Sequence, residues 1–159
     1  MAFSDPINLE YIALIAAVDA PEKTVADFNK AGARIAVATG GTQQGAVEAR
    51  LPEAEAIAVP GIADEVAAVV SGNADAAGVA NTQVGELMAA NPGKFKEIEG
   101  SLSGLQEDCI GVPLGDFDWW LYINQFVHDI NSDGTTFSLY EKWFGPGTSP
   151  GPFSLPPAG

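Results

Sequence analysis

The sequence has little positive charge, one cysteine and one histidine. Its 7 Lys and Arg stand against 21 Asp and Glu, which gives a net charge of −14 over 159 residues. Nucleic acids and anionic membrane surfaces both attract basic residues, so this composition disfavours both kinds of partner. Cys109 is the only cysteine, so an internal disulfide is excluded. His128 is the only histidine, so it has no second His or Cys with which to build a zinc site. We therefore expect no metal and no cofactor.

Long apolar runs are also absent. No run reaches 18 residues, so the sequence contains no candidate transmembrane helix. Residues 1–5 have neither the basic nor the apolar segment of a signal peptide, although an exported mature chain would begin in the same way. The chain does have 47% hydrophobic residues, which suffices for one globular domain with a core.

The most informative stretch is residues 34–50. Arg34–Ala38 predicts a short buried strand, Gly40-Gly41 ends it, and a helix follows from Gln43. Such a turn exposes the first N–H groups of the helix, which favour an anion together with the helix dipole. Thr42 stands at the expected N-cap, where its hydroxyl either caps the helix or reaches a ligand. A strand–helix turn without a ligand explains the same pattern, because a short Gly-rich turn is a weak signal.

Strands and helices alternate along the middle of the chain at roughly 20-residue spacing, which is typical of a parallel α/β sheet with right-handed crossovers. The predicted strands are 34–38, 54–59 and 75–79, and the predicted helices are 43–51, 62–71 and 82–90, the last capped by Asn81 or Thr82. Further predicted elements are 11–18 (strand or short helix), an edge strand at 94–98 and a strand at 109–114. Ligands in such sheets bind beyond the carboxyl ends of the strands, here residues 39–42 and 80–83.

Aromatic residues gather in the C-terminal part of the chain. Asp116 or Asp118 caps a predicted helix that runs to about Ile130. One face of this helix is apolar, and a second, shorter helix spans about 137–144. The apolar face consists of Trp119, Ile123, Phe126, Val127 and Ile130, whereas Asn124, Gln125, His128 and Asp129 occupy the other face, and His128 is expected to be solvated. The Pro- and Gly-rich stretch from Gly145 predicts an irregular end.

Short motifs recur in an order and spacing typical of one family. They are Phe3–Pro6, Gly32–Val37, Gly40–Gln43, Gly72–Ala76, Gly111–Pro113 with Gly115-Asp116, Ile123-Asn124, Asp133–Thr135 and Lys142–Gly145. On these residues the chain resembles the extracytoplasmic solute-binding proteins of ABC transporters, in the polar amino-acid-binding family (family 3). The resemblance implies a periplasmic-binding-protein-like α/β lobe, with a parallel sheet flanked by helices and two C-terminal helices.

Members of that family close two lobes on a ligand, and the resemblance covers the second lobe only. It implies that residues 1–16 are the remnant of the first lobe and a hinge strand, 17–109 the ligand-binding lobe, 110–115 the second hinge strand, 116–145 the C-terminal helices and 146–159 a Pro/Gly-rich tail. In the family these helices pack on the first lobe. We therefore expect the apolar face of residues 119–130 to fold onto the lobe present or to meet another copy in a homodimer or domain-swapped oligomer.

The resemblance also implies a set of ligand-binding residues. Gly41, Thr42 and Gln43 match the turn that grips a ligand carboxylate. The family's acid for the ligand ammonium falls at Ala80, which cannot pair with it. Either the ligand is not an ordinary α-amino acid, or Asn81 or Thr82 reads it through neutral hydrogen bonds. Trp119 either stacks on the ligand or packs in the core.

Three positively or negatively charged residues are expected to lie outside the ligand site. The arginine that clamps the carboxylate belongs to the missing lobe, and neither Arg34 nor Arg50 replaces it, because one opens a strand and the other ends a helix. Asp75 begins a strand and is expected to be structural.

These expectations describe a periplasmic or extracellular solute-binding component without catalytic activity. Its partners would be a small polar solute, such as an amino acid, and the membrane subunits of an ABC importer. An alternative is an enzyme resembling cyclohexadienyl (prephenate or arogenate) dehydratase. Gln83 falls near the acid catalyst of those relatives, and Gln cannot exchange a proton at ordinary pH. A third reading is a structural or sensory half-domain that binds nothing.

Overall fold

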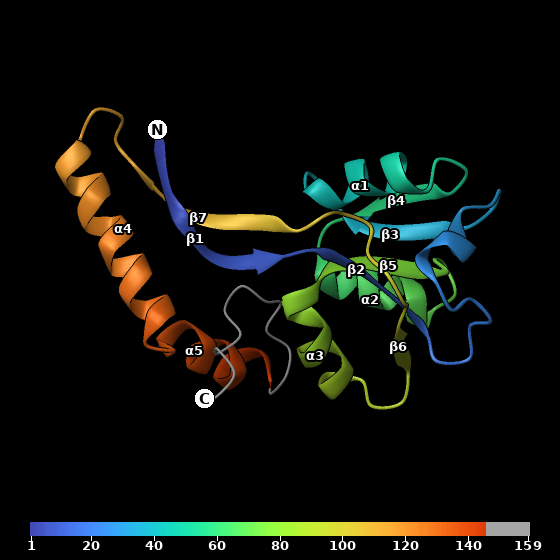
Figure 1. Cartoon of the computed structure of the whole chain (residues 1–159). Helices are drawn as coiled ribbons and strands as arrows, with labels where there is room; N and C mark the ends of the chain where they lie inside the picture. Colours follow the sequence, from blue (N-terminus) through green and yellow to red (C-terminus); the bar gives the residue numbers. More distant parts are fainter. Residues whose placement is uncertain (146–159) are drawn as a thin grey trace. The chain divides into compact units, whose positions relative to one another are not determined.

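The computed structural model describes residues 1–145, and the chain divides into two compact units (Figure 1). We call Tyr11–Gly104 the sheet unit, and Met1–Glu10 together with the chain from Leu105 onward the ribbon unit. The tail predicted at 146–159 lies outside the described residues.

The sheet unit is built on five strands in the order β4-β3-β5-β2-β6 (Figure 1). They are β2 (Ile12–Ala17), β3 (Arg34–Ala38), β4 (Glu55–Val59), β5 (Ala76–Ala80) and β6 (Phe95–Glu97). Strand β3 pairs in parallel with β4 and β5, as predicted. Strand β2 runs antiparallel to β5 and β6, so the sheet is mixed rather than wholly parallel. No crossover helix precedes β2, and its direction is therefore not tied to that of β3–β5.

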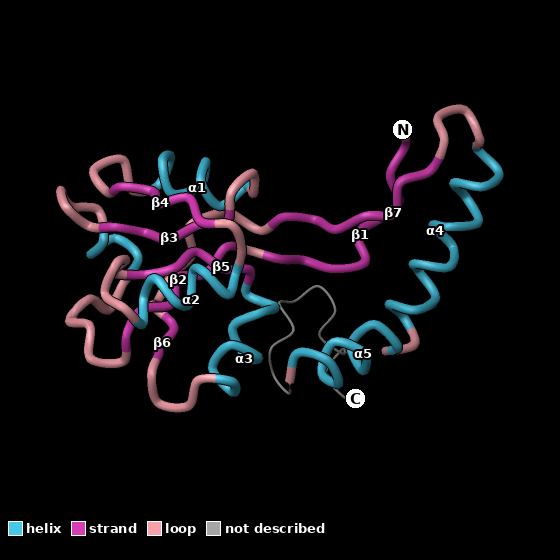
Figure 2. The backbone as a smooth tube through the Cα atoms, turned by 180° about the vertical axis from the view of Figure 1, so that it is seen from behind, coloured by secondary structure: helices cyan, strands magenta, loops and turns pink. Residues whose placement is uncertain are grey.

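Helices cover both faces of this sheet, as predicted for the α/β class (Figure 2). They are α1 (Thr42–Arg50), α2 (Ile62–Val70) and α3 (Asn81–Ala90), with a 3₁₀ turn at Val25–Phe28. Alternate strand residues point to opposite faces. Ile35 and Val37 thus pack with α1 and the 3₁₀ turn, whereas Ala36 packs with α2 and α3.

The ribbon unit pairs the first strand with the last. Strand β1 (Ala2–Glu10) runs antiparallel to β7 (Gln106–Val112), from Ala2 opposite Val112 to Glu10 opposite Gln106. The sequence did not predict β1, because its register shifts around Pro6 and hides the alternation of a regular strand. Ser4, which is buried, accepts a hydrogen bond at its Oγ from the Ile110 N–H (3.0 Å) within this irregular stretch.

Two helices complete the ribbon unit: α4 (Phe117–Ser132), whose Asp116 N-cap accepts from the Trp119 N–H, and α5 (Thr135–Phe144). Helix α4 packs on β1. Trp120 Nε1 donates to the Phe3 carbonyl (2.8 Å), and Asn124 Oδ1 accepts from the Asp5 N–H (2.7 Å). These bonds satisfy backbone groups of β1 and select the face of α4 that turns toward it.

The selected face coincides only in part with the predicted apolar face, which included Val127 together with Trp119 and Phe126. Val127 is fully buried, whereas Trp119 and Phe126 remain 46% and 48% exposed. The prediction assigned Asn124 to the solvent face, and this was wrong, because its amide bonds both β1 and the Trp120 carbonyl. No helix within residues 1–145 combines the length and apolarity needed to cross a membrane.

Candidate functional site

Strand β3 leads into α1 through the two glycines that the sequence singled out. Gly40 has φ +79°, a left-handed backbone conformation that glycine adopts readily and residues with a Cβ rarely do. Gly41 is the N-cap of α1 and donates its N–H to the Ala38 carbonyl (3.3 Å). The predicted cap at Thr42 is therefore off by one residue. Thr42 is the first helical residue and is exposed, so its hydroxyl faces water rather than capping the helix.

Because the N-cap is a glycine, no side chain caps the first N–H groups of α1. Gln43 adds an acceptor beside these donors. Its Oε1 fills the space that a Cβ on Gly41 would need. The same oxygen is buried and has no hydrogen-bond partner among the described residues. The turn thus combines uncapped donors with one unsatisfied acceptor.

Strand β5 leads into α3 in a similar way, with Ala80 as the N-cap. The predicted cap at Asn81 or Thr82 was also displaced, since these are the first two helical residues. Asn81 Oδ1 accepts from the Tyr11 N–H (2.9 Å), and the Asn81 N–H donates to the Tyr11 carbonyl (3.0 Å). Asn81 therefore ties the start of α3 to the residue before β2.

The two helix starts lie at one edge of the sheet. Strands β3 and β5 are adjacent and parallel, so their carboxyl ends meet at the same edge. The predicted residues Gly41–Gln43 and Asn81-Thr82 are brought to that edge. Trp119 belongs to the ribbon unit, and its place in a ligand site stays a prediction.

A buried acid on α2 was missed by the sequence reasoning. Glu65 is only 1% exposed, and neither of its carboxyl oxygens has a hydrogen-bond partner among the described residues. Burial raises its pKa from 4.5 to about 7, and the nearby backbone of Ala38 lowers it in part. A signal was present, because Glu65 falls three residues after Ile62 and four before Val69 on the apolar side of the helix.

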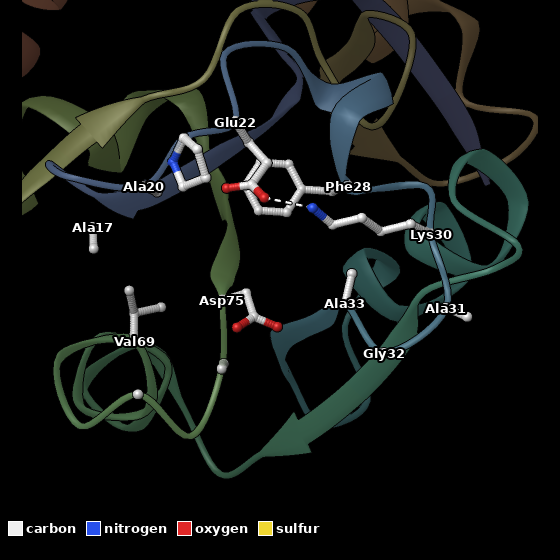
Figure 3. Close-up of a pocket in the computed structure, with 13 residues that line it drawn as sticks. Ala17, Ala20, Glu22, Phe28, Lys30, Ala31, Gly32, Ala33, Val69 and Asp75 are labelled. Carbon is white, nitrogen blue, oxygen red and sulfur yellow. Dashed lines mark hydrogen bonds and ion pairs between the residues drawn. The ribbon is translucent and has the colours of Figure 1, made fainter.

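The opposite edge of the sheet contains a hollow of about 460 Å³ (Figure 3). Its lining includes the charged side chains of Glu22, Lys30 and Asp75; the first two pair with each other, and Asp75 pairs with Arg34, which lies outside the lining. Lys30 Nζ lies 2.6 Å from Glu22 Oε1, and Arg34 Nη2 lies 3.2 Å from Asp75 Oδ1. Asp75 Oδ2 also accepts the Arg34 backbone N–H (2.8 Å), in agreement with the structural role expected for Asp75. Each of the three charged side chains that line this hollow therefore has an ion-pair partner.

Other reactive groups give no second centre. No group of three His, Cys, Asp or Glu side chains in residues 1–145 has the arrangement of a metal site. Burial raises the pKa of the Cys109 thiol, and Glu107, Asp108 and Asp5 raise it further, so this thiol is not an activated nucleophile. His128 is exposed, as expected, and lies 3.5 Å from Ser132 Oγ.

Comparison with known proteins places this fold among solute-binding proteins. No family model matches the chain, and no curated protein matches it. A putative binding component of an ABC transporter from Wolinella succinogenes, complexed with lysine, has a TM-score of 0.79 at 22% identity over 89% of this chain and 62% of its own. An ancestral cationic amino acid solute-binding protein has a TM-score of 0.75 at 26% identity, over 90% and 62%.

A structure described as an ancestral amino-acid-binding protein, a precursor of cyclohexadienyl dehydratase, has a TM-score of 0.74 at 27% identity, over 89% of this chain and 61% of its own. The chain thus spans about three fifths of the length of the structures it matches. The predicted periplasmic-binding-protein-like α/β fold is confirmed by these similarities and by the helices on both faces of the sheet.

Proposed function

We propose that the chain is a solute-binding lobe of an ABC-type importer, working in the periplasm or outside the cell. The solute is an amino acid or another small carboxylate-bearing molecule. The observation that carries the proposal is the pair of helix starts, α1 and α3, at the carboxyl ends of adjacent parallel strands. Its support is a fold shared with amino acid solute-binding proteins.

In this proposal the uncapped N–H groups after Gly41 and the hydroxyl of Thr42 bind the ligand carboxylate. Gln43 Oε1 accepts a hydrogen bond from the ligand, which satisfies its unpaired oxygen. Thr82 offers a second hydroxyl at the same edge, and Asn81 positions it. The net charge of −14 favours a cationic over an anionic amino acid.

The proposed partners beyond the solute are the membrane subunits of the importer and a second copy of the chain. Trp119, Phe126 and Trp143 are 46%, 48% and 71% exposed, and a soluble monomer rarely leaves such an apolar surface open. We propose a homodimer or a domain-swapped oligomer through α4 and α5. Light scattering that gives a monomer at high micromolar concentration would reject this part of the proposal.

The binding proposal is tested by NMR titration of the full chain with L-arginine, L-lysine and L-glutamine. We expect a dissociation constant of about 1 mM or weaker, because one lobe supplies only part of the contacts. Backbone amides at Gly41–Gln43 and Asn81-Thr82 should shift. If none of these ligands, and no organic acid, shifts them at about 20 mM, a dissociation constant in this range is ruled out.

Thr42→Ala removes the Thr42 hydroxyl and keeps the backbone N–H groups of the turn, so it tests the hydroxyl alone. Removing one ligand hydrogen bond should weaken binding about three- to tenfold. Thr135→Ala is the matched control, because Thr135 is also the first helical residue after a glycine N-cap but lies on α5 in the other unit. Equal affinities for the two variants would remove Thr42 from the proposed site.

A dehydratase-like enzyme is the second candidate, favoured by the description of one structural neighbour as a precursor of cyclohexadienyl dehydratase. Gln83 stands at the position where the resemblance places an acid. Its Oε1 accepts the Ala80 N–H (3.3 Å), and an amide cannot act as a proton donor of this kind. Turnover of prephenate or arogenate by the full chain would favour the enzyme over the binding protein.

A further inference from the structure

Glu65 is the buried polar group for which the rest of the fold gives no use. Its carboxyl is 1% exposed and both oxygens lack a hydrogen-bond partner among the described residues. Burying an unpaired charge is unfavourable, so such a group either neutralises or serves a function that offsets the penalty. A Val or Leu at the same place would pack in the apolar layer between α2 and the sheet without this penalty.

The position of Glu65 links it to the proposed ligand site. Its carboxyl lies beside the backbone of Ala38, the last residue of β3. The carbonyl of Ala38 in turn accepts the N–H of Gly41, the N-cap of α1. Ala38 therefore contacts both the Glu65 carboxyl and the Gly40–Thr42 turn.

No countercharge faces Glu65 from the elements packed on α2, which are β2, β3, β4 and β5. Strands β2 and β5 contain no charged residue. On β3 and β4 the charged residues are Arg34 and Glu55, which pair in register at the opposite end of the strands, about 13 Å from Ala38 along β3. Asp64, on α2 itself, is exposed. Protonation is the remaining means of neutralising the carboxylate.

We propose that Glu65 is a proton-controlled positioning residue beneath the Gly40–Thr42 turn: its neutral form allows the turn to bind the carboxylate of a ligand, and its ionised form opposes that binding. The inference rests on the proposed function and adds to it a pH dependence held by a residue that does not touch the ligand.

Two effects act in the same direction when Glu65 loses its proton. First, the buried negative charge of Glu65 repels a ligand carboxylate bound at the neighbouring helix start. Second, the same charge attracts the Ala38 N–H. Ligand binding must then favour the protonated acid, so the protein takes up a proton as it binds near neutral pH. A one-unit rise of the Glu65 pKa on binding corresponds to about a fivefold loss of affinity between pH 6 and pH 8.

The first test needs no ligand. Backbone amide shifts of Thr39–Gln43 are followed by NMR from pH 5 to pH 9 in the full chain, in Glu65→Gln and in Asp64→Asn. Gln has the size of Glu and mimics its neutral form, whereas Asp64 is an exposed acid one residue away. We expect the turn amides to titrate with a midpoint of about 7 in the wild type and in Asp64→Asn, and to stay constant in Glu65→Gln. The same titration in Glu65→Gln would overturn the proposal.

The second test measures L-arginine affinity at pH 6 and pH 8. We expect about a fivefold difference in the wild type and in Asp64→Asn, and none in Glu65→Gln, whose affinity should match the wild type at pH 6. If Glu65 has only a structural role, Glu65→Gln should bind L-arginine more weakly than the wild type at both pH values. That result would contradict the proposal. If the wild type binds no amino acid, the proposed function fails, while the turn titration still decides whether Glu65 controls the turn.

Discussion

Polar groups are hydrogen-bonded at the start of strand β3, whereas at its end several lack a partner among the described residues. At the start, Arg34 donates its backbone N–H to Asp75 Oδ2 and its guanidinium to Asp75 Oδ1 and the Gly72 carbonyl. At the end, the next helix has a glycine N-cap without a side-chain bond. There Gln43 Oε1 and both oxygens of Glu65 lack a partner among the described residues.

This difference separates a structural edge from a candidate binding edge better than the size of a hollow does. The hollow of about 460 Å³ lies at the paired edge, where Lys30 and Glu22 also neutralise each other. A buried polar group without a partner costs about 1–3 kcal/mol. The unpaired groups of Gln43 and Glu65 therefore make the other edge the candidate binding edge.

The largest expected effect comes from making the unpaired edge neutral with Glu65→Gln. The Glu65 pKa is raised from 4.5 to about 7 in the folded protein, so the folded state keeps a proton that the unfolded chain loses above pH 4.5. The stability that the protonated Glu65 contributes to the folded state is complete below pH 4.5, declines as the pH rises toward 7 and is lost above pH 7. At pH 8 the variant should therefore be more stable than the wild type by up to about 3 kcal/mol.

Urea unfolding at pH 5 and pH 8, followed by a signal from the sheet unit, measures this effect. The wild type should lose stability between the two pH values by more than Glu65→Gln does. Asp64→Asn is the control for a general charge effect and should keep the wild-type pH dependence. Parallel pH profiles for wild type and Glu65→Gln would mean that Glu65 is paired or solvated in solution.

A smaller effect is expected at the paired edge from Asp75→Ala. The substitution removes the acceptor of the Arg34 N–H and one ion pair, and should lower the free energy of unfolding by about 1–2 kcal/mol. Most of this comes from the backbone hydrogen bond, since an exposed ion pair contributes little. Amino-acid affinity should stay unchanged. A loss of affinity larger than about threefold would show that the two edges are not independent.

The sequence predicted most of the sheet unit because its elements are bounded by local signals. Strand β3 matches the prediction at both ends, and the helices predicted at 43–51, 62–71 and 82–90 end within one residue of the expected positions. The turn at Gly40-Gly41 was found from its glycines alone. The predicted N-cap of α1 was misplaced by one residue. The side chain of Thr42 suggested Thr42 as the cap, but Gly41 has the extended conformation of an N-cap residue.

What the sequence did not predict depends on contacts between distant segments. Strand β1 forms only by pairing with β7, over a hundred residues later, through a register that shifts at Pro6. Asn124 looked like a solvent residue until β1 supplied its partner. Glu65 was hidden because hydrophobic periodicity counts apolar residues, whereas an acid on an apolar face is visible only as an exception to it.

The smallest expected effect comes from the glycines on either side of β3. Gly32 precedes the strand with φ +85° and Gly40 follows it with φ +79°, and a Cβ on either would meet nothing within 4 Å. Alanine therefore fits in space but is strained in the left-handed region, which costs about 1 kcal/mol at each position. Gly32→Ala and Gly40→Ala should lower the free energy of unfolding by similar amounts in urea titrations. Only Gly40→Ala should also weaken amino-acid binding, because strain relief there moves the N–H groups of the turn. Equal affinities for the two variants would mean that the turn does not hold the ligand, and that the contrast between the two ends of β3 concerns stability alone.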